Sequence, residues 1–508
     1  MSAQLLLREF ARVGEAPGAV AYLRRFVLDL AVQGQVVPQD AGDVPASITL
    51  NDGGVPLGRF LTPFPSPRGW SWIPLGSLMR ADARSVNPAE TPDQTFCLWS
   101  VPSFLDGRPE IISGRDIGST KREHVHGDVL LSKINPHLNR VWLTGGFEEY
   151  RQIASSEWIP LDPHGLSRKL LRYFLMSPYF LSEFCSILTG IGGSLRRVRP
   201  ADAAQKRLPI PPVAEQHRIV AKVDELMGLC DELEAAQTHR EARRDRLRAT
   251  SLRNLVAPEE PKENARFFLR HSARMITRPE HVAGVRQAIL DLAVRGRLVR
   301  REGDWIPSNL GAVGRWGSGG TPATGTREFY GGSIPWIVIG DLNEGVVTKT
   351  AQMITEAGLA NSSAKLIDPG TVLIAMYGAS VGKLGIAGTQ CSTNQAIANC
   401  VPDPSKIDRN FLFLLLRSIR APLVASAKGG AQPNISQTVI KGWKVDLPPI
   451  AEQRRIVAKM DELMAVCDEL EESLATEQTE RGRLLDALLR DALEDALPAR
   501  ELELLGAR

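Results

Sequence analysis

The chain contains an internal duplication, and this feature constrains its fold more than any other. Residues 211–234 read PPVAEQHRIVAKVDELMGLCDELE and residues 448–471 read PPIAEQRRIVAKMDELMAVCDELE, so that 19 of 24 positions are identical at an offset of 237. A second pair repeats at an offset of 262: LDLAVQGQVV at 28–37 and LDLAVRGRLV at 290–299. Two such matches in the same order predict a chain built from two related halves.

Between the repeated segments lie two inserts of nearly equal length, residues 70–210 and 305–447, whose sequences have largely diverged. A weak echo at their starts is Trp72-Ile73-Pro74 against Trp305-Ile306-Pro307. A repeated frame around two different inserts suggests that the frame has one shared function and the inserts have two different ones. The alternative is that the duplicated domains have simply diverged in sequence, evenly along their length. The predicted regions are 1–69 (helical, then a Pro/Gly-rich connector), 70–210, 211–304 (long helix, linker, helical repeat), 305–447 and 448–508 (helix).

The two repeated segments predict long amphipathic helices that begin after Pro-Pro pairs, where proline suits a first helical turn. Apolar residues recur with a 4-3-4-3 spacing, which is an a/d seam able to form a coiled coil. The seam residues are Ile219, Val223, Leu226, Cys230 and Leu233 in the first helix and Ile456, Met460, Leu463, Cys467 and Leu470 in the second. The alternative is that each helix lies on its own neighbouring domain.

The two inserts predict mixed α/β domains. Short strand-like runs at Asp128–Leu131, Ile334–Ile339 and Thr371–Ala375 alternate with Gly/Pro-rich turns. Each insert also has one helical apolar stretch, Lys169–Leu188 in the first and Phe411–Ala425 in the second. The fold class expected for the whole chain is therefore α/β mixed, with two α/β domains and two long helices.

Composition limits the classes of protein that this chain can belong to. At 508 residues it is long enough for two to four domains. Its net charge is only +3, but residues 451–508 carry 8 basic and 15 acidic residues, which leaves the preceding 450 with a net of +10. The six cysteines form no CxxC pair, the N-terminal sequence MSAQLLLREFARV has no signal-peptide pattern, and the apolar run 411–416 is too short to cross a bilayer. We expect a cytoplasmic protein with no membrane partner.

Motifs for catalysis are incomplete. Gly378 to Leu384 resembles a phosphate loop, but it lacks the four-residue spacing between glycines and the Ser/Thr after lysine. The closest histidine pair, His124 and His126, fits an alternating strand better than a metal site. The sequence therefore predicts no enzymatic activity, no metal and no cofactor in this chain.

Each insert carries an excess of basic residues, 17 against 14 acidic residues in the first and 12 against 8 in the second. Glycines and small polar residues beside these cations would let the backbone approach phosphates and side chains reach base edges. The candidate DNA-binding residues are Ser132, Lys133, Asn135, Arg140, Ser194, Arg196, Arg197 and Arg199 in the first insert and Tyr377, Ser380, Lys383, Gln432, Asn434 and Ser436 in the second. Gly192 and Gly429 differ by 237, so these loops hold equivalent positions. Ordinary surface turns are the alternative.

The length of the repeated helix suggests a spacing. About 26 residues at about 1.5 Å each span about 39 Å, close to one DNA turn of about 34–36 Å. Two reading domains held apart by such helices would address two half-sites roughly one turn apart.

Taken together, these segments resemble the specificity subunit of a type I restriction-modification system. The resemblance rests on LDLAVQGQVVPQD at 28–40 with its copy at 290–299, on SGGTP at 318–322 with YGGSIPWI at 330–337, on GDVLLSKINP at 127–136, on QPNIS at 432–436, and on both PPxAEQxRIVAKxDELM helices. It covers nearly the whole chain. The first insert has no clear counterpart of the SGGTP run, so only Thr321 and its neighbours gain DNA-contact status from the resemblance.

This resemblance implies two target recognition domains, each binding one half of a bipartite, asymmetric DNA sequence. It implies that two conserved helices form an antiparallel coiled coil as a spacer, in a pseudo-twofold arrangement. It further implies docking of two methyltransferase subunits that carry S-adenosylmethionine, and of two restriction subunits that use ATP with Mg²⁺. No catalysis would reside in this chain. The competing hypotheses are a coiled-coil scaffold whose inserts bind proteins, and a self-contained nuclease or methyltransferase, which the missing motifs disfavour.

Overall fold

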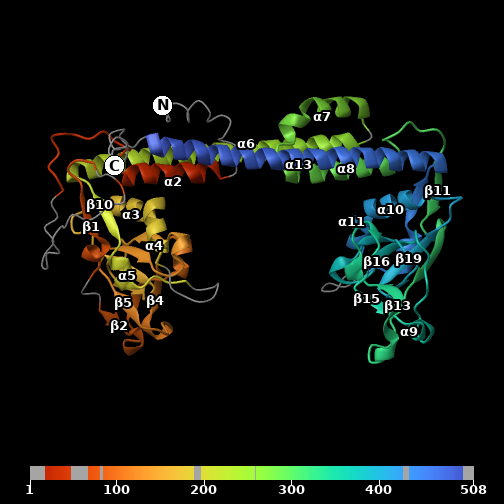
Figure 1. The fold of residues 1–508 in the computed structure, drawn as a ribbon, viewed down its shortest axis with the longest axis horizontal. Coiled ribbons are helices and arrows are strands. Elements are labelled where there is room, and N and C mark those ends of the chain that lie inside the picture. Colours follow the sequence, from red (N-terminus) through yellow and green to blue (C-terminus); the bar gives the residue numbers. More distant parts are fainter. Residues whose placement is uncertain are drawn as a thin grey trace, which may run out of the picture. The chain divides into compact units, whose positions relative to one another are not determined.

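The computed structural model describes residues 16, 18–46, 64, 67–80, 84–187, 196–257, 259–426 and 434–495. The chain divides into two compact units. Unit 1 comprises Met1–Arg240 with Gln478–Arg508, and unit 2 comprises Glu241–Glu477. Each unit contains one insert together with parts of both long helices (Figure 1).

The two ends of each insert come together in a pair of antiparallel strands. In unit 1, β1 (Ser71–Pro74) pairs with β10 (Arg207–Ile210). In unit 2, β11 (Ile306–Asn309) pairs with β20 (Lys444–Leu447). Insert 1 (residues 70–210) and insert 2 (residues 305–447) therefore each leave the helical frame and return to it at one place.

Both inserts contain the same three-stranded antiparallel arrangement. Insert 1 has the order β7-β6-β9, from β6 (Val129–Ser132), β7 (Val141–Leu143) and β9 (Trp158–Leu161). Insert 2 has β17-β16-β19, from β16 (Val372–Ala375), β17 (Leu384–Ala387) and β19 (Ile397–Pro402), extended at its edges by β12 (Gly314–Ser318) and β14 (Val346–Val347). In both, the strand followed by the candidate loop is the central one.

A second sheet is also shared. In insert 1, β3 (Thr95–Trp99) pairs in parallel with β8 (Arg151–Ser155) and antiparallel with β4 (Glu110–Ser113), and β2 (Ser85–Val86) and β5 (Lys121–Glu123) extend the sheet. In insert 2, β13 (Tyr330–Ile337) pairs in parallel with β18 (Ser392–Thr393) and antiparallel with β15 (Gln352–Ile354). The inserts therefore share a topology that their sequences no longer display.

Apolar helices cover the first sheet of each insert. In insert 1, α3 (Arg168–Met176) and α4 (Pro178–Cys185) replace the single helix predicted over 169–188, because Ser177 caps a new helix whose first residue is proline. In insert 2, α10 (Arg409–Ser418) begins at the N-cap Asp408 and is followed by α11 (Arg420–Ala425). A five-residue helix, α9 (Glu356–Ala360), lies between β15 and β16. Leu188 lies outside the described residues.

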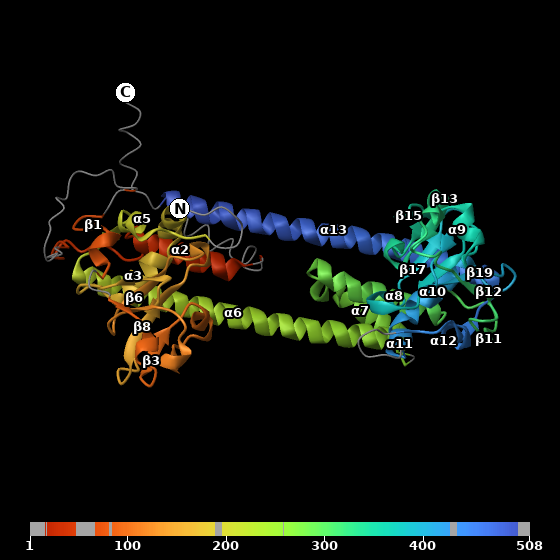
Figure 2. The ribbon, with the colours of Figure 1, turned by 90° about the horizontal axis from the view of Figure 1, so that it is seen from below.

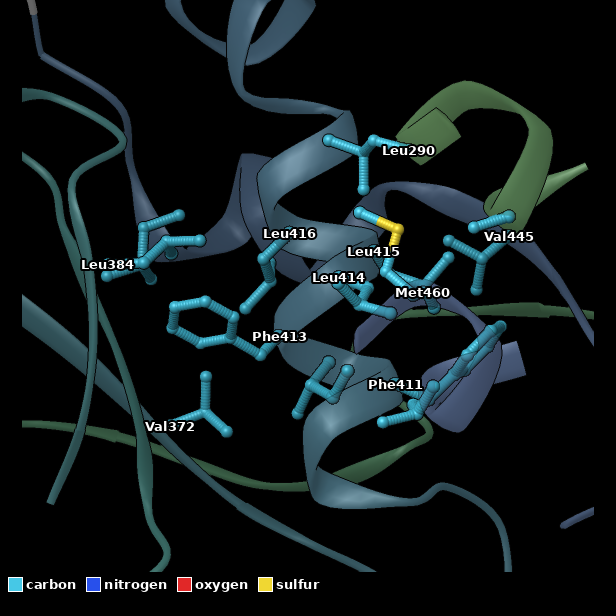
Figure 3. Close-up of a cluster of buried hydrophobic side chains, with 14 of the residues drawn as sticks. Leu290, Val372, Leu384, Phe411, Phe413, Leu414, Leu415, Leu416, Val445 and Met460 are labelled. Atoms are coloured by element: carbon cyan, nitrogen blue, oxygen red, sulfur yellow. The ribbon is translucent and has the colours of Figure 1, made fainter. Parts of the chain in front are cut away.

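The middle of α10, from Phe411 to Leu416, is buried at every position, which explains its continuous apolar run. Phe411, Phe413 and Leu416 lie in one cluster with strand residues of β16 and β17 and with α8 and α13 (Figure 3). Burial of a Phe or Leu side chain contributes about 1.5–3 kcal/mol. This cluster fixes insert 2 to the frame.

Within the described residues, the frame consists of two long and three short helices. The long helix α6 (Val213–Val256) begins in unit 1 and ends in unit 2, and α13 (Ile450–Asp495) begins in unit 2 and ends in unit 1. The short helices are α2 (Ala19–Val32) in unit 1 and α7 (Pro261–Met275) and α8 (Val282–Val294) in unit 2. Figure 2 shows α8 between the C-terminal part of α6 and α13, and Leu252, Leu290 and Met460 join the same hydrophobic cluster.

The long helices are longer than the repeat predicted. The predicted length was about 26 residues, whereas α6 has 44 residues and α13 has 46. Sequence identity between the copies fades after position 234, but no helix breaker follows until Pro258. A spacing of one DNA turn derived from 26 residues is therefore not supported by these helix lengths.

The predicted seam is largely buried. Ile219, Val223 and Leu226 pack into the core of insert 1, which fits the alternative that each helix lies on its own neighbouring domain. In unit 2 the matching residues join the cluster formed by insert 2 and α8; they are Ile456, Met460, Leu463, Cys467 and Leu470. Cys230 is buried and Leu233 is half-buried. Direct pairing of the two long helices as an antiparallel coiled coil stays a prediction.

Candidate nucleic-acid interface

The fold of insert 1 brings together two candidate segments that lie about sixty residues apart in the sequence. Ile134 and Arg197 form an antiparallel bridge. The Asn135 amide donates to the Arg196 carbonyl at 2.8 Å, and the Val198 amide donates to the Lys133 carbonyl at 2.9 Å. The basic segment at residues 196–199 is thus held against the turn after β6 by backbone hydrogen bonds. Lys133, Asn135, Arg196 and Arg197 therefore belong to one surface.

The turn itself depends on asparagine. Asn135 has φ +46°, in the left-handed region that asparagine tolerates better than most residues. Its side-chain oxygen accepts a hydrogen bond from the Arg196 amide at 3.1 Å. Asn139 has φ +49°, and its amide group donates to the Met176 carbonyl of α3 at 2.8 Å. Asn135 is therefore as much a structural residue as a candidate contact.

Cations dominate this surface, which we name the insert 1 basic surface (Lys133, Arg196, Arg197, Arg199). Arg196, Arg197 and Arg199 are exposed. Arg197 pairs with Glu157 at 3.0 Å, and Arg199 lies 3.8 Å from Asp202. The pKa of Lys133 is lowered by partial burial and by the nearby Arg122 and Arg197, against the opposing effect of Glu157. An anion placed here would relieve that repulsion.

Three candidates of insert 1 are buried, half-buried or outside the described residues. Ser132 is only 1% exposed, and its hydroxyl donates to the Ile134 carbonyl at 3.0 Å. Its side chain is therefore not accessible in this structure, and a contact with DNA stays a prediction. Arg140 is half-buried, and its carbonyl accepts from the Ser132 amide. Ser194 lies outside the described residues.

Insert 2 repeats this geometry with different side chains. Tyr377 and Asn434 form an antiparallel bridge, and the Ile435 amide donates to the Met376 carbonyl at 2.9 Å. Tyr377 is 40% exposed and Asn434 is exposed. We name Tyr377, Ser380, Lys383, Asn434 and Ser436 the insert 2 polar surface. Gln432 lies outside the described residues.

The remaining members of the insert 2 polar surface are shaped by turns and caps. Gly378 and Gly382 have φ +74° and +79°, so the loop between them needs glycine at both ends. Within it the Lys383 amide donates to the Ser380 carbonyl. Ser436 is the N-cap of α12 (Gln437–Gly442) and accepts from the Val439 amide at 3.3 Å. In insert 1 the corresponding helix is α5 (Pro200–Ala204), with Arg199 as N-cap.

The SGGTP run is held by close backbone contacts. A Cβ at Gly319 would lie 1.8 Å from the Thr393 carbonyl oxygen, and one at Gly320 would lie 2.3 Å from the Ala364 nitrogen. Both glycines are therefore required by packing. Thr321 donates its hydroxyl to the side-chain oxygen of Gln395. Gln395 and, in insert 1, Arg122 are exposed polar residues near the candidates that the sequence reasoning missed.

The frame anchors both inserts with matching buried polar groups. Glu215 accepts from the Trp70 indole N–H at 2.9 Å, and Glu452 accepts from the Trp305 indole N–H at 3.0 Å. Trp70 is therefore the structural counterpart of Trp305, and the echo that aligned Trp72 with Trp305 is shifted by two residues. The cause is the carboxylate on the long helix, which only an indole at position 70 reaches.

On each long helix, a buried glutamine forms hydrogen bonds with the backbone at the start of the helix that covers the sheet. Gln453 accepts from the Asp408 amide at 2.7 Å and donates to the carbonyls of Lys406 and Pro448. Gln216 accepts from the Ser167 amide at 3.0 Å and donates to the Pro211 carbonyl. The EQ pair repeated in PPxAEQ thus positions each insert on its helix.

The histidine pair divides between core and surface. His124 is 4% exposed and its pKa is lowered by burial, whereas His126 pairs with Glu148 at 2.9 Å. Among the described residues, no group of three or more His, Cys, Asp or Glu side chains is arranged to hold a metal ion. Within the same residues, no helix is long and apolar enough to cross a membrane.

Comparison with known proteins shows what the chain is similar to. The model of the type I restriction modification DNA specificity domain matches residues 302–479. The specificity subunits of the type I restriction enzymes EcoEI and EcoAI of Escherichia coli are 26% and 23% identical to the chain, and each alignment covers 93% of both proteins. A chain from a structure of the assembly and conformational transition of the type I R-M system has a TM-score of 0.52 at 23% identity, covering 85% of this chain and 99% of that one. Residues 302–479 thus match the type I restriction modification DNA specificity domain, and over 93% of its length the chain is similar to specificity subunits of type I restriction enzymes.

Proposed function

We propose that the chain supplies the DNA sequence specificity of a type I restriction-modification complex, with each insert reading one half of a bipartite, asymmetric DNA target. The observation that carries this proposal is the pair of equivalent surfaces. The bridge Ile134–Arg197 in insert 1 and the bridge Tyr377–Asn434 in insert 2 occupy the same place in the shared topology, yet the exposed side chains differ. Equivalent position with different chemistry suits two domains that read different bases.

The repeated frame has a different part in the proposal. Its long helices hold the two inserts and set the spacer between half-sites, and its repeated surfaces dock two methyltransferase subunits. Restriction subunits, of which two are expected, join the same complex. S-adenosylmethionine and ATP with Mg²⁺ are bound by these partner subunits, and no catalytic step is assigned to this chain, which acts in the cytoplasm on double-stranded DNA.

The proposal is tested by mapping methylated bases in the host genome with and without the gene. The expected result is the loss of one split motif, two short blocks separated by a fixed gap, on deletion. An unchanged methylation map in a strain that expresses the neighbouring methyltransferase would contradict the proposal. The alternative of a protein-binding scaffold is not favoured by the comparisons. It predicts little salt-dependent DNA binding, whereas a DNA-reading complex loses affinity steeply as salt rises.

A further inference from the structure

The two halves of the frame can be compared position by position. The short helices α2 and α8 correspond at an offset of 262, and the C-terminal part of α6 corresponds to that of α13 at an offset of 237. The contacts follow the same correspondence. In unit 1, Arg24 pairs with Asp231 and Glu234, and in unit 2 the matching Arg286 pairs with Asp468 and Glu471.

In unit 1 the space between the short helix and the end of the long helix is filled. Tyr22, Leu23 and Phe26 of α2 pack against a buried cluster on α13 that includes Leu485 and Leu489. Tyr22 and Phe26 lie one helical turn apart, so both project onto the same face. Leu485 is 0% exposed and Leu489 is 7% exposed.

In unit 2 the matching space holds no large side chain from α8, although Ala288 itself is only 4% exposed. The positions of Tyr22 and Phe26 are occupied by Gly284 and Ala288. The result is a groove of about 470 Å³ between α6 and α8. Its lining includes Leu252 and Arg253 of α6, Gly284, Ala288 and Asp291 of α8, and Arg295, the C-cap of α8. Leu252, which borders Gly284, is the counterpart of Leu489.

Gly284 lowers the stability of α8 in the chain without a partner. It lies inside α8, where glycine destabilises a helix by about 1 kcal/mol relative to alanine. The backbone would accept a side chain, because a Cβ at this position would meet only the flexible end of Leu252, at 3.1 Å. The groove therefore exists because a side chain is absent at position 284, and the backbone conformation does not require glycine there.

The rim of the groove is basic. Arg253 and Arg295 are exposed, and the Arg253 guanidinium donates to the Thr250 hydroxyl at 3.2 Å. Asp291, the one carboxylate of the lining, accepts from the side chain of Gln287 at 2.9 Å. Among the described residues, neither arginine forms an ion pair with a carboxylate. Carboxylates on an occupant would therefore be favoured.

We infer that this groove receives an amphipathic helix of a partner protein, which places two large apolar side chains, one turn apart, against Gly284 and Ala288 and carboxylates against Arg253 and Arg295. Unit 1 provides the argument for this occupant, since there the chain's own Tyr22 and Phe26 fill the matching space. Buried aromatic anchors of this kind dominate interface energies. The inference rests on the proposed docking of methyltransferase subunits and adds that the two halves dock them differently, with one copy per chain using the groove.

The test fills the groove with the residues of the first half. The double variant Gly284→Tyr with Ala288→Phe is compared with Ala283→Tyr, which adds a side chain of similar size at an exposed neighbouring position of α8. The methyltransferase subunit is titrated onto the full chain, and the complexes are counted by native mass spectrometry. We expect the filled variant to lose at least 10-fold in affinity for one methyltransferase copy, and Ala283→Tyr to bind like the wild type.

A charge variant keeps the inference testable if the filled chain fails to fold. Arg253→Glu with Arg295→Glu changes only exposed side chains and is expected to weaken the same copy by about 10-fold, with a salt-sensitive effect. Wild-type binding by both the filled and the charge variants would overturn the inference while leaving the proposed function intact. Absence of any methyltransferase binding by the wild-type chain would overturn the docking part of the proposed function itself. Loss of a dimer of this chain in the filled variant would identify a second copy as the occupant and would also contradict the inference.

Discussion

Insert 1 and insert 2 share a strand topology and present different chemistry from the same place. The insert 1 basic surface carries Arg196, Arg197 and Arg199, whereas the insert 2 polar surface carries Tyr377 and Asn434 at the matching turn. In the frame the repeated segments are similar in sequence, and the packing differs at Gly284, which faces Leu252 in the diverged part of α6. The comparison teaches that one scaffold can be kept by buried contacts while its exposed side chains diverge.

The largest expected difference concerns DNA binding by the assembled complex. Arg196→Ala, Arg197→Ala and Arg199→Ala together remove up to three phosphate contacts, so affinity should fall by at least about 100-fold (roughly 3 kcal/mol). The salt slope should fall by about 2.7. Tyr377→Ala with Asn434→Ala should leave the slope nearly unchanged and relax the sequence preference of one half-site. Fluorescence anisotropy at several salt concentrations measures both; equal slopes for the two variants would remove the distinction between the surfaces.

The buried glutamines should differ by one hydrogen bond. Gln453 makes three hydrogen bonds to backbone groups and Gln216 makes two. Each buried group left unpaired costs about 1–3 kcal/mol, so Gln453→Leu should destabilise its unit by about 3 kcal/mol or more and Gln216→Leu by about 2 kcal/mol. Hydrogen exchange at the start of α10 and of α3 reports the two local openings separately. A larger effect at Gln216 would contradict the assignment.

A pH-dependent difference is expected at Asp29. Burial raises the pKa of this carboxyl to about 6, against the opposing hydrogen bond from the Tyr179 amide at 3.1 Å. The pKa of Asp29 is higher in the folded than in the unfolded protein, so the protonated carboxyl contributes to the stability of the fold at low pH. This contribution is lost as the pH rises through about 6. Asp29→Asn should therefore raise stability by about 1–2 kcal/mol at pH 8 and give no gain near pH 4. Thermal unfolding at both pH values measures this, with Asp291→Asn, the matching position in α8, as the control.

The smallest expected effects on stability come from an ion-pair arrangement that both halves of the frame share, and they should be equal in the two halves. Arg24 and Arg286 each pair with two carboxylates on a long helix, at 30% and 25% side-chain exposure. Partly exposed pairs contribute about 0.2–1 kcal/mol. Arg24→Ala and Arg286→Ala should therefore each lower the unfolding temperature slightly and by similar amounts. A difference of several degrees between them would show that the two copies of this clamp are not equivalent.

The structural repeat covers more of the chain than the sequence identity between the two halves does. The 237-residue offset placed the loops of both inserts in matching positions, and the frame contacts of Glu215 and Glu452 follow the same offset. The shared sheets could not be predicted, because buried strand positions such as Leu130 and Leu373 accept any apolar residue and leave no motif. The burial of Ser132 could not be predicted either, because all four residues of β6 are buried and the strand shows no alternation.

The docking groove was also beyond the sequence argument. Gly284 and Ala288 read as ordinary helix residues until their neighbours on α6 are known. The pairing of Trp70 with Glu215 likewise required the fold, since Trp72 gave the better local match. Contacts across long sequence separations decide both cases.

The central claim is that each insert reads its own half-site, and exchanging one insert tests it most directly. Insert 2 (residues 305–447) has the paired strands β11 and β20 at its two ends, so the matching insert of a related specificity subunit can replace it without cutting the frame. Mapping methylated bases in cells that carry the exchanged chain should show one half of the split motif changed, with the other half and the gap length preserved. A change in both halves, or an unchanged motif, would contradict the account.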